Sequence, residues 1–176
     1  MGVDFYCNNI TFGCSYGGWA EIRKTIILAT FKYLREKFED KEKYGDECED
    51  FCYVKLIQNL IEKFEYIYNA MGCSNNLLSI LNSNLIYQDA LIHFDLGGLY
   101  SLCNKNDCEG YYTPGNALDI CKLLDIIKDS LHNLDSEYDW IYDEKYEKYD
   151  GCDLIAVSVY QLFKYSYENN KKIRIS

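Results

Sequence analysis

Apolar residues recur at steps of three and four along most of this chain, and this spacing is typical of helices that bury one face. The repeat is clearest over 51–71, and Gly72 follows it as a residue that commonly caps a helix. A second repeat over 19–43 predicts another helix with one buried face. These two segments predict that helices dominate the fold.

Shorter repeats predict the other helices. The stretch 77–92 is interrupted by Asn82-Ser83-Asn84, whose side chains compete for backbone hydrogen bonds, so we expect two short helices there. Thr113 and Pro114 fit an N-cap and a first helical residue. The helix after them presents one apolar face, made of Ala117, Ile120, Cys121, Leu124, Ile127 and Leu131. A last helix is expected over about 152–168.

Strands are predicted at both ends of the chain. Residues 3–7 alternate, and 10–16 are rich in strand-forming residues up to Gly17-Gly18, which we expect to end them. The tail 172–176 alternates as well and is predicted to pair beside 3–7. One more short strand is expected at 99–102.

The length limits the number of domains. A chain of 176 residues, 48% of them hydrophobic, can bury one real core but is short for two ordinary domains. It contains no internal repeat and no linker rich in proline, glycine or serine. We therefore predict a single domain over 1–176. Its class is α+β and predominantly helical, with about five or six helices and a minor β-sheet from the N-terminal strands and the C-terminal tail.

The net charge and the cysteine content indicate which partners and which cellular compartment to expect. A formal net charge of −10 disfavours a surface that binds phosphates, so we expect neither nucleic acid nor an anionic membrane as partner. No apolar run approaches the roughly 18 residues of a membrane span. The nine cysteines follow no apolar leader segment, which favours an intracellular, cytoplasmic protein whose thiols are free and mostly buried.

The sequence offers weak metal sites. Cys48 with Cys52, and Cys103 with Cys108, approach the paired spacing of zinc ligands, but a buried helical stripe explains the first pair equally well. The acidic turn before Gly110 is similar to part of a calcium loop, yet Lys105 and Asn116 stand where that loop needs an aspartate and a glutamate. We therefore predict neither a metal nor a cofactor, and keep a metal-stabilised module as a third alternative.

Nucleophilic catalysis would require a thiol beside a base. Besides His132, the chain has only His93, which flanks the same loop as Cys103 and Cys108, and Gly97-Gly98 would let the backbone approach closely. A small cysteine-dependent enzyme using Cys108 or Cys103 with His93 is therefore the alternative function. A histidine at a helix end is more often a surface residue or a partner of the helix dipole.

An acidic, tyrosine-rich segment covers 135–150. Aromatic side chains that give large contact areas at low entropic cost are spread through it, and such residues favour protein interfaces: Tyr138, Trp140, Tyr142, Tyr146 and Tyr149. The alternative interpretation is that these rings pack on the domain while their hydroxyls stay in water. The acidic charge of the segment favours a basic partner protein.

Two pieces of the chain resemble known sequences. The start, Met1-Gly2-Val3-Asp4-Phe5-Tyr6, and the later His93, Asp107-Cys108-Glu109-Gly110 and Thr113-Pro114 are similar to a group of small uncharacterised proteins of large DNA viruses and bacteria. Those proteins begin Met-Gly-x-Asp-Phe-Tyr and carry a His-x-Asp-Cys-Asp-Gly-x-x-Ser-Pro turn before a helix. Here about a dozen residues separate the histidine from that turn, so the resemblance requires an insertion. Together with a bias toward residues with AT-rich codons, the resemblance implies a viral protein in the host cytoplasm. It does not identify any catalytic residues, because the group has no assigned activity.

These observations favour a soluble, non-enzymatic protein that binds another protein through its acidic, aromatic surface. The cysteine-dependent enzyme is the alternative.

Overall fold

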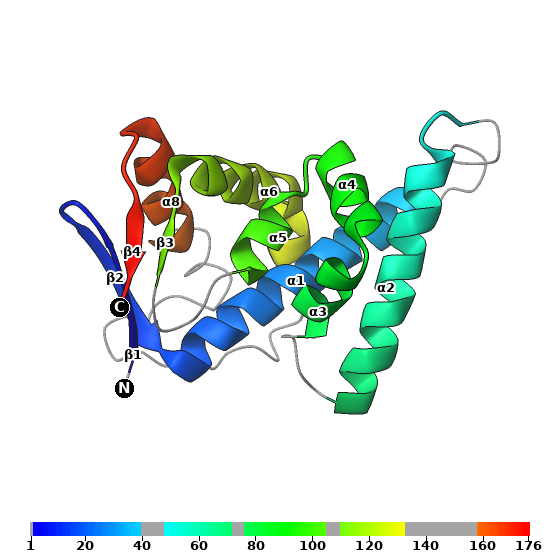
Figure 1. Cartoon of the computed structure of the whole chain (residues 1–176), viewed down its shortest axis with the longest axis horizontal. Helices are drawn as coiled ribbons and strands as arrows, with labels where there is room; N and C mark the ends of the chain where they lie inside the picture. The colour runs from blue at the N-terminus through cyan, green and yellow to red at the C-terminus, as the bar shows by residue number, and fades with distance from the viewer. Residues whose placement is uncertain (1, 40–47, 72–75, 105–109, 133–157) are drawn as a thin grey trace.

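The computed structural model describes residues 2–39, 48–71, 76–104, 110–132 and 158–176. These ranges form a small sheet at one end of the molecule and a group of helices that extends away from it (Figure 1). The helices are α1 (Tyr16–Phe38), α2 (Phe51–Met71), α3 (Asn76–Ser83), α4 (Leu85–His93), α5 (Gly98–Cys103), α6 (Pro114–His132) and α8 (Tyr160–Glu168). The strands are β1 (Gly2–Cys7), β2 (Ile10–Ser15), β3 (Gly110–Tyr112) and β4 (Ile173–Ile175). The predicted class, α+β and mostly helical, is confirmed.

The sheet is antiparallel, with the strand order β2-β1-β4-β3. β1 and β2 form a hairpin with a two-residue turn, in which Asn8 takes the left-handed conformation (φ 59°) that asparagine tolerates well. The C-terminal tail pairs beside β1 as predicted, with Phe5 opposite Ile175. β3 extends the sheet on the far side of β4, and the sequence did not predict this strand.

The double glycine has a different role from the one predicted. Ser15 caps α1 directly after β2, because its Oγ accepts a hydrogen bond of 3.0 Å from the Gly18 amide. Gly17 and Gly18 therefore lie in the first turn of the helix, and no loop separates β2 from α1.

α1 is buried on most of its circumference. The sequence predicts one buried face, but Ile22, Thr25 and Ile27 are all buried although they point in different directions around the helix. The reason is that α1 contacts the sheet near its start, α5 and α6 along its middle and α2 near its end. At the sheet, Trp19 packs on Phe5 with ring centroids 4.5 Å apart.

The predicted break after α3 is confirmed. Ser83 donates its hydroxyl to the Ile80 carbonyl (2.8 Å), and the Asn84 side chain accepts a hydrogen bond of 3.2 Å from the Ile86 amide. These side chains end α3 and cap α4. α2 runs over the predicted residues, while its expected cap, Gly72, lies outside the described residues.

The strand predicted at 99–102 is wrong, because these residues belong to α5. Leu99 and Leu102 are fully buried beneath α6, which helical spacing allows and an isolated strand would not. Gly98 makes this packing possible: a Cβ on it would lie 2.2 Å from the Asp119 carbonyl oxygen of α6. The close backbone approach expected at the second double glycine is therefore real, and it serves helix packing.

The start of α6 follows the prediction. Thr113 Oγ1 accepts a hydrogen bond from the Asn116 amide, and Asn116 Oδ1 accepts one from the Thr113 amide, each of 3.1 Å. This reciprocal pair satisfies the amide of Asn116 in the first turn and the amide of the capping residue Thr113. The predicted apolar face is buried throughout: Ala117, Ile120, Cys121, Leu124, Ile127 and Leu131. The last predicted helix, 152–168, corresponds at its C-terminal part to α8, while residues 152–157 lie outside the described ranges.

The contrast between the two neighbouring glycines gives a test of α5–α6 packing. Gly98→Ala should lower the free energy of unfolding by about 1–3 kcal/mol, because the methyl group meets backbone that cannot move aside. Gly97→Ala is the matched control. Its methyl group would meet the flexible Ile92 side chain at 3.1 Å, so the change should stay within about 0.5 kcal/mol. Urea unfolding measures both, and equal effects would contradict the proposed role of Gly98 in helix packing.

Candidate functional site

His93 is the last residue of α4, and it contacts the start of α2. Its Nε2 lies 2.7 Å from Oδ1 of Asp50, the residue that precedes α2, and both side chains are more than one third exposed. The imidazole also stacks on the Tyr53 ring, with centroids 4.0 Å apart and an interplanar angle of 14°. Asp50 and Tyr53 are separated by about one helical turn, so both can reach the same imidazole.

A line of rings continues from His93 to α1. The edge of His93 meets Phe94 (4.9 Å between centroids), and Phe94 meets Phe38 at the end of α1 (4.8 Å). The Lys37 ammonium lies 5.2 Å from the Phe94 centroid, within range of a cation–π contact. We call Phe38, Asp50, Tyr53, His93 and Phe94 the His93 corner. It joins the ends of three helices.

The contacts of the His93 corner do not assemble the predicted catalytic pair. No hydrogen bond of the described residues joins His93 to a thiol, and Cys108 lies outside them. Cys103 is buried in α5, and this burial raises the pKa of its thiol to about 12, although the charge of the nearby Arg23 acts in the opposite direction. Cys103 is therefore a thiol at neutral pH, and the thiolate is the reactive form.

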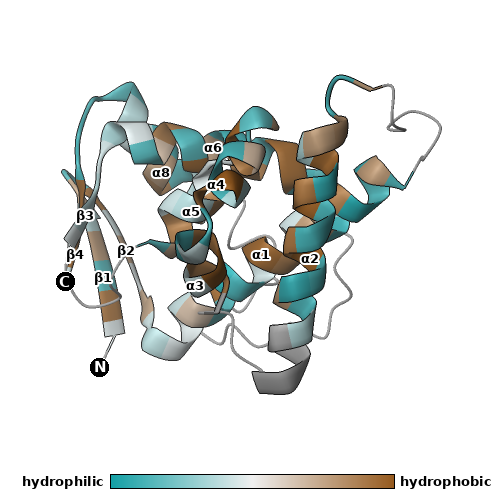
Figure 2. Cartoon of the chain, turned by 45° about the vertical axis from the view of Figure 1, so that its right-hand side comes forward, coloured by the Kyte–Doolittle hydropathy of each residue, from teal (hydrophilic) through white to brown (hydrophobic). Residues whose placement is uncertain are grey.

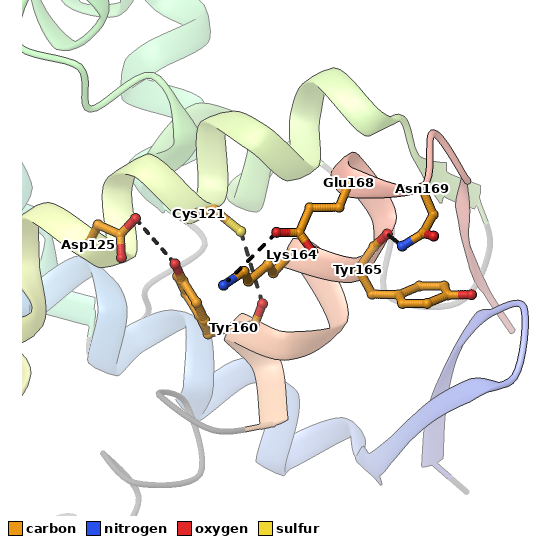
Figure 3. A network of polar contacts seen from close by, with 7 residues as sticks. All are labelled: Cys121, Asp125, Tyr160, Lys164, Tyr165, Glu168 and Asn169. Carbon is orange, nitrogen blue, oxygen red and sulfur yellow. Dashed lines mark hydrogen bonds and ion pairs between the residues drawn. The ribbon is translucent and has the colours of Figure 1, made fainter.

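A second polar network lies between α6 and α8 (Figure 3). Tyr160 donates its hydroxyl to Asp125 (3.3 Å), and the Cys121 Sγ lies 4.0 Å from the Tyr160 carbonyl oxygen. Burial, followed by the hydrogen bond to Asp125, raises the pKa of Tyr160 to about 12. Burial also raises the pKa of Cys121 to about 12. Both groups thus stay protonated at neutral pH, and the network holds α8 on α6.

The described residues do not supply a metal centre, since no group of three or more histidine, cysteine or acidic residues among them is placed to hold an ion. At the start of α2, Cys48 is half-buried and Cys52 is exposed. Asn116, the last position of the calcium-like loop, uses its side-chain oxygen in the cap of α6.

Thiol burial is less general than predicted. Cys7, Cys103 and Cys121 are buried, Cys14 and Cys48 are half-buried, and Cys52 is exposed. Burial therefore applies to half of the described cysteines.

The outer side of α4 is the exposed surface that sequence reasoning missed. Leu85, Ile86 and Ile92 are 66%, 51% and 62% exposed, although their spacing places them within the apolar repeat of 77–92. They share one side of the helix with Asp89, while Tyr87, Ala90 and Leu91 fill the buried side. α4 is therefore apolar on both sides, and its hydrophobic residues are brown in Figure 2. We call Leu85, Ile86, Asp89 and Ile92 the α4 outer face.

The predicted partner-binding residues, Tyr138, Trp140, Tyr142, Tyr146 and Tyr149, lie outside the described residues. Among the described helices, none combines the length and the apolar character that crossing a membrane requires. Comparisons of the chain with protein-family models, with curated proteins and with solved structures find no significant match. Function is therefore inferred from the residues of this chain.

The state of Cys103 can be tested by its reactivity. In the folded protein at pH 8, iodoacetamide should modify Cys103 about a hundredfold or more slowly than Cys52, because Cys103 is buried and protonated. Pulsed alkylation followed by peptide mass spectrometry measures the two rates, and unfolding in urea should make them equal. Rapid modification of Cys103 in the folded protein would instead favour the cysteine-dependent enzyme.

The His93 corner should contribute to stability through two separable contacts. His93→Phe keeps a ring against Tyr53 but loses the bond to Asp50, and should cost about 0.2–1 kcal/mol of unfolding free energy. His93→Ala loses the stacking as well, which should cost about 0.5–1.5 kcal/mol more. Asp89→Asn, on the outer face of the same helix, is the control. Equal losses for the two His93 variants would show that the stacking contributes nothing.

Proposed function

We propose that this protein is a non-enzymatic protein-binding module and that the α4 outer face is part of its binding surface. The observation that carries this proposal is the exposure of Leu85, Ile86 and Ile92 on one side of one helix. Single exposed apolar residues are common, but several together on one helix face are a feature of interaction sites.

The energetics support a protein partner. Fully burying an exposed leucine or isoleucine contributes about 1.5–3 kcal/mol, so covering the part of Leu85, Ile86 and Ile92 that is still exposed contributes about 1–2 kcal/mol for each. The backbone beneath them is already ordered, because Asn84 caps α4 at its start and the His93–Asp50 bond holds its end. A partner that binds this face therefore orders little of the α4 helix, which lowers the entropic cost of association.

The charges around the α4 outer face favour a basic partner. Asp89 lies among the apolar residues, and Asp95 follows the end of the helix, where it stays 71% exposed although the Lys122 ammonium lies 3.9 Å from its Oδ1. The whole chain carries −10. A helix with an apolar stripe flanked by lysine or arginine would match both the apolar residues and the carboxylates.

The acidic aromatic segment 135–150 is the second part of the proposed surface. Its charge has the same sign as that of the α4 outer face, so both would attract the same kind of partner. The resemblance to proteins of large DNA viruses adds the proposal that the partner is a host protein of the cytoplasm.

The proposal is tested by capture from cell extract with quantitative mass spectrometry. Proteins enriched by the wild-type chain should fall at least tenfold with Leu85→Gln/Ile92→Gln, because glutamine keeps the helix but removes the apolar contact. Tyr66→Gln on α2 is the matched control, since Tyr66 is 79% exposed at a different place.

A second variant tests the acidic segment in the same assay. Tyr138→Ala/Trp140→Ala/Tyr142→Ala should lower the capture of the same proteins if both surfaces bind one partner. Folding of each variant is checked by its urea unfolding curve. Capture that is unchanged in both variants would rule out the proposed function.

A further inference from the structure

Among the described strands, β2 forms the longer edge of the sheet. It lies at the end of the strand order, and no described strand pairs with its outer side. β2 has six residues, whereas the strand at the other edge, β3, has three. In Figure 1 the tip of the β1–β2 hairpin projects from the body of the molecule.

The hydrogen bonds of β1 determine which groups of β2 point outward. Asp4 exchanges two backbone hydrogen bonds of 3.0 Å with Ser176, so its N–H and carbonyl point away from β2. Asp4 pairs with Gly13, and Tyr6, two residues further along β1, pairs with Thr11. Because these directions alternate along an antiparallel ladder, Thr11 and Gly13 direct their own N–H and carbonyl groups to the free edge.

This edge lacks the features that usually prevent strand pairing. Natural edge strands carry charges, proline or bulges, or are very short. β2 reads Ile-Thr-Phe-Gly-Cys-Ser, with no charge and no proline, and its register with β1 has no bulge. Thr11 and Ser15 at the two ends of this edge are exposed.

We propose that two copies of this chain associate through β2, side by side and antiparallel, so that their sheets become one continuous sheet. The pairing is self-complementary, because Thr11 of one copy can face Gly13 of the other in both directions. The N–H and carbonyl groups that Thr11 and Gly13 direct outward would then be satisfied in both copies.

The side chains beside the edge favour a second copy as the occupant. Asp4 extends over Gly13, since its Oδ1 lies 2.5 Å from the place where a Cβ on Gly13 would be. In the proposed pairing, this carboxylate lies on the same face as the Thr11 hydroxyl of the other copy, which can donate to it. β2 itself is uncharged, so two chains of charge −10 can approach along it.

The hairpin is also held in place before association. β4 pairs along β1, and Asn8 at the turn donates a hydrogen bond of 3.3 Å to the Tyr165 hydroxyl of α8. Pairing at β2 therefore requires little further ordering of the strand.

Sedimentation equilibrium over a range of concentrations, with hydrogen exchange of single amides, tests this proposal on the full chain. The wild-type protein should show a dimer, and the Thr11 and Gly13 amides should become protected as the concentration rises. Thr11→Glu should raise the dissociation constant at least tenfold, because its carboxylate would face Asp4 of the other copy. Thr11→Lys should dimerise at least as well as the wild type, because it would face the same carboxylate with a positive charge.

Tyr111→Glu is the matched control, since it adds the same charge at an exposed position of β3, at the opposite edge of the sheet, and it should leave the dimer unchanged. Thr11→Pro removes an outward N–H at an edge position that tolerates proline, and should give a monomer. A monomeric wild-type protein at several hundred micromolar, or a dimer whose Thr11 and Gly13 amides exchange freely, would overturn the proposal. A dimer that is lost in Leu85→Gln/Ile92→Gln but kept in Thr11→Glu would overturn it as well, and would show that a second copy covers the α4 outer face.

Discussion

The burial of α1 is the constraint on which the rest of this structure depends. A helix of 23 residues leaves β2 without a loop, crosses the molecule and contacts the sheet, α5, α6 and α2. Because the Ser15 cap continues directly from β2, the direction of the hairpin also sets the direction of the helix. The sheet, α2, α5 and α6 all pack against α1, which explains why side chains on different sides of it, such as Ile22 and Ile27, are both inaccessible.

Polar contacts then hold the ends of the elements, where apolar packing is thinnest. The His93 corner joins α4 to α2 and reaches α1 through Phe94 and Phe38, while the Tyr160–Asp125 bond holds α8 on α6. In both places the rare or ionisable residues are engaged by neighbouring elements. These contacts do not involve the two proposed surfaces, which are the α4 outer face, apolar apart from Asp89, and the uncharged edge of β2.

Local signals in the sequence predicted local features well. The break between α3 and α4 at Asn82-Ser83-Asn84 and the Thr113 cap with Pro114 each depend on residues whose preferences act over a few positions. The pairing of the tail with β1 joins the two ends of the chain, and only the alternation within each strand was a local signal for it. The predictions failed where the outcome depended on distant neighbours. The stretch 99–102 looks like a strand by itself, but α6 approaches over Gly98 and favours a short helix. Asp50 precedes His93 by 43 positions, and no sequence spacing indicates that they meet.

The sequence by itself therefore determined the fold class, the break between α3 and α4, the cap of α6 and the acidic charge, because periodicity and capping preferences are short-range properties of the chain. Only the tertiary structure decided which apolar residues are covered. Leu91 and Ile92 are both large apolar residues and are adjacent in the chain, yet Leu91 is fully buried and Ile92 is 62% exposed. Their burial depends on which side of α4 meets α2, and that is a property of the packed helices.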